Sequence, residues 1–420
     1  MYQITRLKNG LTIATTEMPH MASVSLGIWV GVGGRYEPAE ISGVSHFIEH
    51  LLFKGTKKRS AEKISQDVEG IGGYLNAFTS EESTCFYSKA RADKFDELLD
   101  VLADMFLHST FAPVEIERER HVIKEEIAMY RDQPQQYVQE LLNETIWPDQ
   151  PLGRSLAGTE KTLDATTRAK ILDYQQKNYV TGATIISVAG KLQHKQVVEA
   201  VSKFSKYFRV GKRATFIPAN NHQAAPRSQL FTKDTEQTQV ALGIRGCSRH
   251  DERRYAMRLL NTVLGENMSS RLFQTVREKH GLAYSIYSSP SYFDDTGDLV
   301  ISAGLETKNL EKALKLISHE LKQLAQKIIS QGELRRARDY VIGQLDMSLE
   351  STESQMMWMG EHFLGYGKIS SPNEVKARLR EVRAGEIRSI ARELFRPERL
   401  NLALVSPLKK TPALIRILKV

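Results

Sequence analysis

Short apolar runs along the first 90 residues predict strands with helices between them. Residues 24–32, 74–78 and 84–89 are runs of strand length. Two shorter runs at the N-terminus meet at Asn9-Gly10, a dipeptide that accepts the positive φ angles of a tight hairpin turn. Residues 42–53 and 61–71 predict helices instead.

Longer helical patterns follow. Residues 93–107 and 113–132 carry apolar side chains three and four positions apart, with charged residues between them. Another strand is predicted at 183–189. The first half of the chain is therefore expected to form a sheet with several covering helices.

The second half repeats features of the first. Residues 242–244 (Leu-Gly-Ile) repeat residues 26–28 at an offset of 216, and residues 333–342 resemble 115–123 at an offset of roughly 219. Residues 210–229 are polar and contain two prolines, which predicts a linker. We therefore predict an α+β fold of two homologous, duplicated domains, 1–209 and 230–420, each a mostly antiparallel sheet covered by helices.

Composition excludes several classes of protein. A length of 420 residues suits two domains, and 41% hydrophobic with 26% charged residues is ordinary for a soluble protein. The net charge of +8 comes from 58 basic and 50 acidic residues that are interleaved, as in 115–120, rather than gathered into a basic patch. No apolar run approaches the roughly 18 residues of a membrane span. We expect no nucleic acid and no membrane as partner.

The two cysteines, Cys85 and Cys247, are too few for a disulfide framework and fit a reducing compartment. No signal peptide or Arg-rich presequence precedes the first strand. A cytoplasmic location is therefore the expectation.

Candidate chemistry begins with His46 and His50. Four residues apart on a helix, their imidazoles project from one face, as two ligands of one tetrahedral ion require. Glu49 is adjacent and can take a proton from metal-bound water without being a ligand itself. The alternative is a buried helix with two incidental histidines, but His-x-x-Glu-His arises by chance in only roughly 2 of 100 such chains. We interpret the motif as a catalytic zinc site.

Such a site needs a third protein ligand. The residues alone leave five candidates open on the helix at 113–132: Glu115, Glu117, Glu119, Glu125 and Glu126. Glu119 and Glu126 are seven residues apart and share one face, so that one could bind the metal while the other orients a histidine.

Four stretches carry a resemblance to a known family: residues 34–37 (Gly-Arg-Tyr-Glu), 45–56, 75–80 and 117–127. In order and spacing they resemble the inverzincin peptidases, family M16, which include pitrilysin, insulin-degrading enzyme and mitochondrial processing peptidase, and above all its short bacterial members. The resemblance implies a zinc metallopeptidase with one Zn²⁺ per chain. It places the zinc ligands on His46, His50 and Glu126, the catalytic base on Glu49, and on Glu119 the glutamate that orients a ligating histidine.

The resemblance also assigns substrate contacts. It implies that an extended substrate adds to a sheet edge beside Asn76 and Ala77, although this stretch alone could be a turn that enters a strand. In the second half of the chain, the resemblance implies that Tyr284 donates a hydrogen bond to the developing oxyanion and that Arg277 binds the substrate backbone. Read alone, Arg277 and Tyr284 would be structural residues at the end of a helix and the start of a strand.

Similar enzymes enclose peptides or unfolded polypeptide segments in a chamber between two halves, and this chain has the length of one half. Because it carries both the metal motif and the Arg277/Tyr284 pair, the expectation is a self-sufficient homodimer. Two alternatives stay open: the catalytic half of a heterodimer, or an inactive structural homologue. Residues 265–270 match a loop that is glycine-rich in the non-catalytic processing subunit, but they hold one glycine. Manganese or cobalt could replace zinc.

Overall fold

The computed structural model describes residues 2–410, 414, 417 and 418, which form two compact units. The first unit takes the residues up to Ile127, then Arg154–Ile217 and Asp346–Ser371. The second takes Ala128–Gly153, Pro218–Leu345 and the residues from Pro372 onward. Each unit thus contains residues from both halves of the chain. The domains 1–209 and 230–420 were predicted from the sequence repeat, and they stay a prediction.

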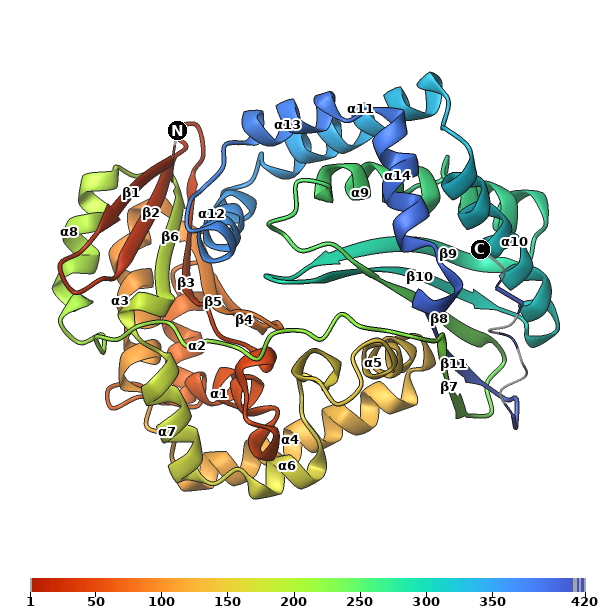
Figure 1. Ribbon diagram of the computed structural model, residues 1–420. Coiled ribbons are helices and arrows are strands. Elements are labelled where there is room, and N and C mark those ends of the chain that lie inside the picture. Colours follow the sequence, from red (N-terminus) through yellow and green to blue (C-terminus); the bar gives the residue numbers. More distant parts are fainter. Residues whose placement is uncertain (1, 411–413, 415–416, 419–420) are drawn as a thin grey trace. The chain divides into compact units, whose positions relative to one another are not determined.

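The first unit is built on a six-stranded sheet with the order β1-β2-β6-β3-β5-β4 (Figure 1). All neighbours are antiparallel except β2 and β6. Gly10 has φ +93° in the turn between β1 and β2, as the Asn-Gly pair predicts. The strands are β1 (Tyr2–Arg6), β2 (Thr12–Glu17), β3 (Ser23–Val30), β4 (Tyr74–Thr79), β5 (Thr84–Arg91) and β6 (Thr184–Gly190).

The second unit is built on a five-stranded sheet with the order β7-β11-β8-β10-β9, in which β7 and β11 are the parallel pair. The order and strand directions match those of β2-β6-β3-β5-β4, so the predicted α+β fold of duplicated, mostly antiparallel sheets is confirmed. The strands are β7 (Arg227–Thr232), β8 (Thr238–Gly246), β9 (Ala283–Tyr292), β10 (Gly297–Leu305) and β11 (Leu400–Ser406).

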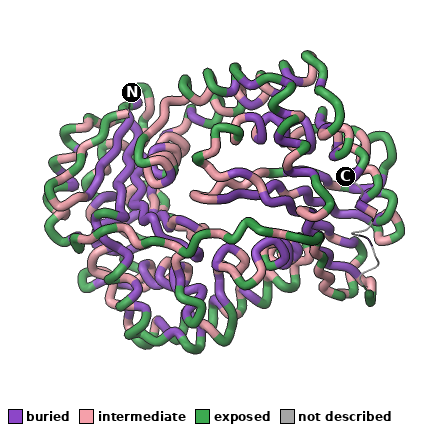
Figure 2. Tube along the Cα trace, viewed as in Figure 1, coloured by how far each residue is buried: buried purple, intermediate pink, exposed green. Residues whose placement is uncertain are grey.

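Helices cover one face of each sheet and bury its apolar side chains, as the buried strands in Figure 2 show. In the first unit the apolar stripe of α3 packs on β3 and β5, and that of α1 packs on β4 and β5. The helices of this part are α1 (Val44–Leu52), α2 (Ala61–Glu69), α3 (Phe95–His108), α4 (Pro113–Asp132), α6 (Glu160–Ala165), α7 (Arg168–Asn178) and α8 (His194–Ser205).

The second sheet is covered in the same way by α9 (Arg254–Asn261), α10 (Leu310–Gln326) and α14 (Ala384–Leu394). α11 (Gln331–Ser348) and α13 (Pro372–Glu381) complete this side. Two π-helical segments, Thr262–Glu266 and Phe273–Lys279, follow α9. None of the described helices combines the length and apolar character needed to cross a membrane.

The opposite face of each sheet is covered by a helix from the other half of the chain. α12 (Thr352–Tyr366) lies between α11 and α13 in sequence but packs on β2, β3 and β6, where Met356 and Met359 belong to one buried cluster with Trp29. α5 (Pro134–Ile146) follows α4 but packs on β7, β8 and β11. This exchange of equivalent helices explains why each compact unit draws on both halves.

The predicted linker at 210–229 has no helix or strand up to Pro226, but Arg227–Gln229 already belong to β7, so its predicted end is three residues too late. Its first part, up to Ile217, is fixed to the first unit, and the part from Pro218 onward belongs to the second. Arg213 donates to the carbonyls of Gly31 and Leu364, each at 2.8 Å, and the ring of Phe216 lies 3.8 Å from the guanidinium carbon of Arg35.

Candidate metal centre

α1 presents His46 and His50 on one side of the helix. Its apolar residues Val44, Phe47, Ile48, Leu51 and Leu52 are buried in the core of the first unit, so the helix is held rigidly. The Nε2 atoms of the two imidazoles lie 3.2 Å apart. Two nitrogens bound at 2.0–2.1 Å to one tetrahedral zinc would be about 3.3 Å apart, so the side chains are already at the separation of ligands.

Glu126 reaches these imidazoles from α4. Its Oε2 lies 3.8 Å from His46 Nε2 and 3.7 Å from His50 Nε2. Among the described residues, these three side chains form the group able to hold a metal ion. The structure thus brings together the three residues on which the family resemblance places the zinc ligands.

The donor set fits zinc. Two imidazoles and one carboxylate are a common set for catalytic zinc, which keeps a fourth position open. Burial, and then the charge of His50, lowers the pKa of His46 to about 4, which keeps this imidazole neutral as a metal ligand must be. His46 Nδ1 is buried and has no hydrogen-bond partner among the described residues, so Nε2 is the ring atom that faces the other ligands.

Glu119 lies behind His50, on the side of the imidazole that carries Nδ1. Its Oε2 is 3.1 Å from His50 Nδ1, its Oε1 is 2.9 Å from Lys54 Nζ, and its side chain is 2% exposed. A proton on Nδ1 that is donated to Glu119 leaves the lone pair of Nε2 free for a metal. Lys54 was missed by the sequence analysis, although it lies inside the stretch 45–56.

Glu49 lies beside the ligands and is held by a neighbour that the sequence analysis also missed. Thr79 Oγ1, at the end of β4, donates a hydrogen bond of 2.5 Å to Glu49 Oε2. Burial raises the pKa of Glu49, and the nearby Glu126 raises it further, while the hydrogen bond from Thr79 and the charge of His50 oppose the rise. A raised pKa brings a carboxylate closer to the range in which a general base works at neutral pH.

β4 is an edge strand, and among the strands that the structure describes it pairs with β5 alone. It contacts α1, so this free edge runs beside the metal ligands. Asn76 is exposed, and its Oδ1 accepts a hydrogen bond of 2.8 Å from the amide of Ala77, which leaves that amide satisfied within the chain. The edge can pair with an added strand, and the roles of Asn76 and Ala77 stay predictions.

Arg277 and Tyr284 belong to the second unit and lie together there. The guanidinium carbon of Arg277 is 5.6 Å from the Tyr284 ring and 4.8 Å from the Phe273 ring. Tyr284 stands near the start of the edge strand β9 and is 79% exposed, so its hydroxyl is accessible. Their contacts with substrate stay predictions.

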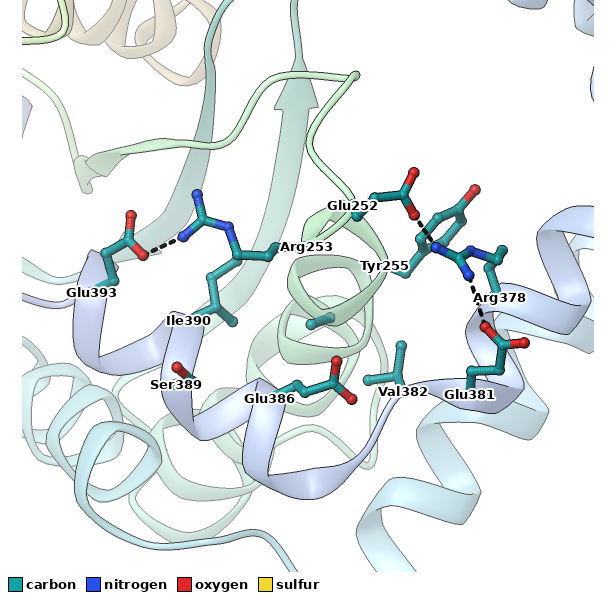
Figure 3. A pocket seen from close by; sticks show the side chains of 11 residues that line it. Glu252, Arg253, Tyr255, Arg378, Glu381, Val382, Glu386, Ser389, Ile390 and Glu393 are labelled. Carbon is teal, nitrogen blue, oxygen red and sulfur yellow. Dashed lines mark hydrogen bonds and ion pairs between the residues drawn. The ribbon is translucent and has the colours of Figure 1, made fainter.

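A separate groove of about 370 Å³ lies in the second unit between α9 and the helices α13 and α14 (Figure 3). Its charged walls are joined by ion pairs, in which Arg378 bridges Glu252 and Glu381 and Arg253 bonds Glu393. None of the predicted site residues lines it.

The chain is similar to known proteins along most of its length. Residues 12–160 match the sequence profile described as insulinase (peptidase family M16), and residues 165–341 match the profile described as the peptidase M16 inactive domain. The chain is 38% identical to an uncharacterized zinc protease of Bacillus subtilis, covering 97% of this chain and 98% of that protein. It is 37% identical to one from Streptomyces coelicolor, covering 97% and 90%.

Solved structures share the fold. A protease from Helicobacter pylori superposes with a TM-score of 0.90 at 22% identity, covering 97% of this chain and 99% of that one. A Pseudomonas fluorescens protein described as a peptidase M16 inactive domain gives the same TM-score at 18% identity, covering 98% and 99%. With a full-length relative at 38% identity and both family profiles in order, the chain belongs to the insulinase family of zinc proteases, peptidase family M16.

Proposed function

We propose that this protein is a zinc metalloendopeptidase that hydrolyses peptides or unfolded polypeptide segments bound in extended form. The observation that carries the proposal is the grouping of His46, His50 and Glu126 beside Glu49 and the free edge of β4. One unit of the fold thus contains a candidate metal site, a candidate base and a strand edge that can bind an extended chain.

His46 Nε2, His50 Nε2 and one oxygen of Glu126 would hold one zinc ion per chain. When bound, zinc supplies a Lewis acid that lowers the pKa of a coordinated water and polarises the scissile carbonyl. Glu119 keeps His50 in the tautomer that can bind metal, through its contact with Nδ1.

Glu49 is the proposed general base. Its carboxylate takes a proton from the attacking water and later gives it to the leaving amine, so one group serves as base and then as acid. The hydrogen bond from Thr79 fixes one carboxylate oxygen and leaves the other free for this proton.

The edge of β4 is the proposed substrate platform. Main-chain hydrogen bonds to an added strand do not depend on side chains, so they tolerate many sequences and require an extended, unfolded segment. Asn76 and Ala77 would flank the scissile bond, once the Asn76 side chain releases the Ala77 amide. Tyr284 would donate a hydrogen bond to the developing oxyanion, and Arg277 would bind the substrate backbone. The proposed enzyme is a cytoplasmic homodimer that encloses its substrate.

The test is zinc content and hydrolysis of a pool of unstructured peptides, for wild type beside Glu49→Gln and Glu125→Gln. Glu125 is exposed on the same helix as Glu126, so its variant controls for loss of a carboxylate near the site. Chelator-sensitive cleavage by wild type and Glu125→Gln, with zinc retained and cleavage lost in Glu49→Gln, is expected. Absence of bound zinc after zinc is supplied contradicts the proposal, and zinc bound without cleavage favours a catalytic half that needs another subunit.

A further inference from the structure

Glu37 is a buried carboxylate at the start of α1, the helix that carries both histidines. It is 3% exposed and lies between two 3₁₀ turns, η1 (Gly34–Tyr36) and η2 (Ala39–Ile41). Its Oε2 accepts a hydrogen bond of 2.6 Å from the amide of Gly43, and its Oε1 accepts one of 2.7 Å from the amide of Ser45. These amides have no partner within the helix, so Glu37 caps α1 from outside it.

α1 needs this external cap because its own N-cap residue is glycine. Gly43 has φ +95°, and a Cβ built there would lie 2.6 Å from the carbonyl oxygen of Ala157. No capping side chain can therefore stand at this position. The main chain of Glu37 is in turn fixed, because Arg154 Nη1 donates to its carbonyl oxygen at 3.0 Å.

The cap lies one turn from a proposed zinc ligand. His46 is the third residue of α1, and the N-terminus of a helix carries roughly +0.5 of an elementary charge, which disfavours a dication bound there. A negative charge on Glu37 offsets this partial charge in a buried, weakly screened setting. Ser45, which precedes His46, also lies 3.0 Å from Tyr174 through its Oγ, so this turn of the helix is fixed on two sides.

The charge state of Glu37 follows from the same contacts. Burial raises its pKa to about 7, while the bonds from Ser45 and Gly43 and the charge of Arg154 oppose the rise. At pH 8 the carboxylate is therefore mostly ionised, and two amides aimed at its two oxygens match that form.

We propose that Glu37 is a positioning residue for the metal centre: its buried carboxylate caps α1, holds His46 in place and offsets the helix charge that would otherwise weaken zinc binding. The inference rests on the proposed zinc site. It assigns to the acidic residue of the stretch 34–37 a role that acts through α1 and involves no contact with substrate.

The experiment measures the zinc dissociation constant of the full chain at pH 8 by competition with a chromophoric chelator. The variants are Glu37→Gln, which keeps the shape and loses the charge, Glu37→Asp, which keeps the charge, and Glu40→Gln. Glu40 is exposed, lies three residues away and gives a matched loss of charge. Circular dichroism of each metal-free variant establishes that it is folded at the temperature of the assay.

We expect Glu37→Gln to bind zinc about 10-fold more weakly, as is typical when a group that orients a ligand is lost. Glu37→Asp should fall between wild type and Glu37→Gln, and Glu40→Gln should match wild type. The inference is overturned if Glu37→Gln binds within twofold of wild type, or if Glu37→Asp loses as much affinity as Glu37→Gln. If Glu37→Gln does not fold, Glu37→Asp decides alone. A zinc affinity of Glu37→Asp equal to that of wild type would then refute a positioning role. A wild type that binds no zinc would refute the proposed function together with this inference.

Discussion

Thr79 Oγ1 donates a hydrogen bond of 2.5 Å to Glu49 Oε2, and so connects the end of the edge strand β4 to the candidate base on α1. The strand that would bind substrate and the carboxylate that would act on it are thereby held in one geometry. A change at Thr79 should act on the base without removing any metal ligand.

We predict that Thr79→Val lowers kcat/KM and moves the acid limb of its pH profile to higher pH. The Thr79 bond opposes the rise in the pKa of Glu49, so its loss raises that pKa and leaves less of the ionised base at neutral pH. A hydrogen bond to a charged group contributes about 1.5–3 kcal/mol, so a fall of roughly tenfold or more is expected. Thr79→Ser, which keeps the hydroxyl, should stay near wild type. An unshifted acid limb in Thr79→Val would show that this bond does not tune the base.

The ligating histidines could be predicted from the sequence because helix geometry is local. A spacing of four residues fixes His46 and His50 on one face whatever the rest of the fold does. Glu126 could not be chosen from the residues alone. Glu119 and Glu126 share one face of the helix, and which of the five glutamates reaches the histidines depends on the approach of α4 to α1. The resemblance to a family supplied that choice.

Residues that act through others were missed for a related reason. Lys54, Thr79 and Glu37 lie in the stretches that carry the family resemblance, but a lysine, a threonine and a glutamate have no distinctive spacing. Their partners are Glu119, Glu49 and the α1 amides, and the first two of these contacts join residues 65 and 30 positions apart. The exchange of α5 and α12 was missed because apolar periodicity reports that a helix face is buried, and not which sheet buries it.

We predict that Glu119→Gln weakens zinc binding by roughly 10- to 100-fold while the three ligands stay in place. Glu119 holds the Nδ1 proton of His50, and outer partners of ligating histidines have effects of this size. Lys54→Met should weaken zinc binding less, since it removes only the second contact of the same carboxylate. Chelator competition measures both. Affinity unchanged in Glu119→Gln, relative to Glu125→Gln as control, would exclude this role.

We predict that Glu37 makes the metal-free protein less stable as the pH rises from about 4.5 to about 7. Its pKa in the folded state is raised to about 7 from 4.5, so in this window the folded state binds more protons than the unfolded one, and the free energy of unfolding falls with pH. The full effect is about 3 kcal/mol, at 1.36 kcal/mol for each pH unit.

His46 has the opposite effect over about pH 4 to 6.5, because its lowered pKa makes the folded state bind fewer protons. The comparison of wild type with Glu37→Gln cancels that contribution. Urea unfolding in the presence of chelator should show the stability of wild type, relative to Glu37→Gln, falling between pH 5 and pH 7.5. A constant difference would mean that Glu37 does not titrate in this range.

We predict that Gly360→Ala destabilises the packing of α12 on the sheet of the first unit. A Cβ at Gly360 would lie 2.2 Å from Cε2 of Trp29, which is fully buried and donates from Nε1 to Ser187 Oγ at 3.0 Å. The ring cannot move aside without losing that bond, and overpacking of this kind costs about 1–3 kcal/mol. The urea midpoint of the first unit should therefore fall.

Gly343→Ala on α11 is the matched control, because a Cβ there meets no atom within 4 Å. In a helix, alanine in place of glycine stabilises by up to about 1 kcal/mol. Gly343 belongs to the second unit and Gly360 to the first, so Gly343→Ala should raise the midpoint of the second unit while Gly360→Ala lowers that of the first. If both variants were stabilised to the same degree, helix propensity alone would govern Gly360, and the close packing of α12 on β3 would not be what holds the exchanged helix. A fall in Gly360→Ala alone would instead identify this contact as the one that commits α12 to the sheet of the other half.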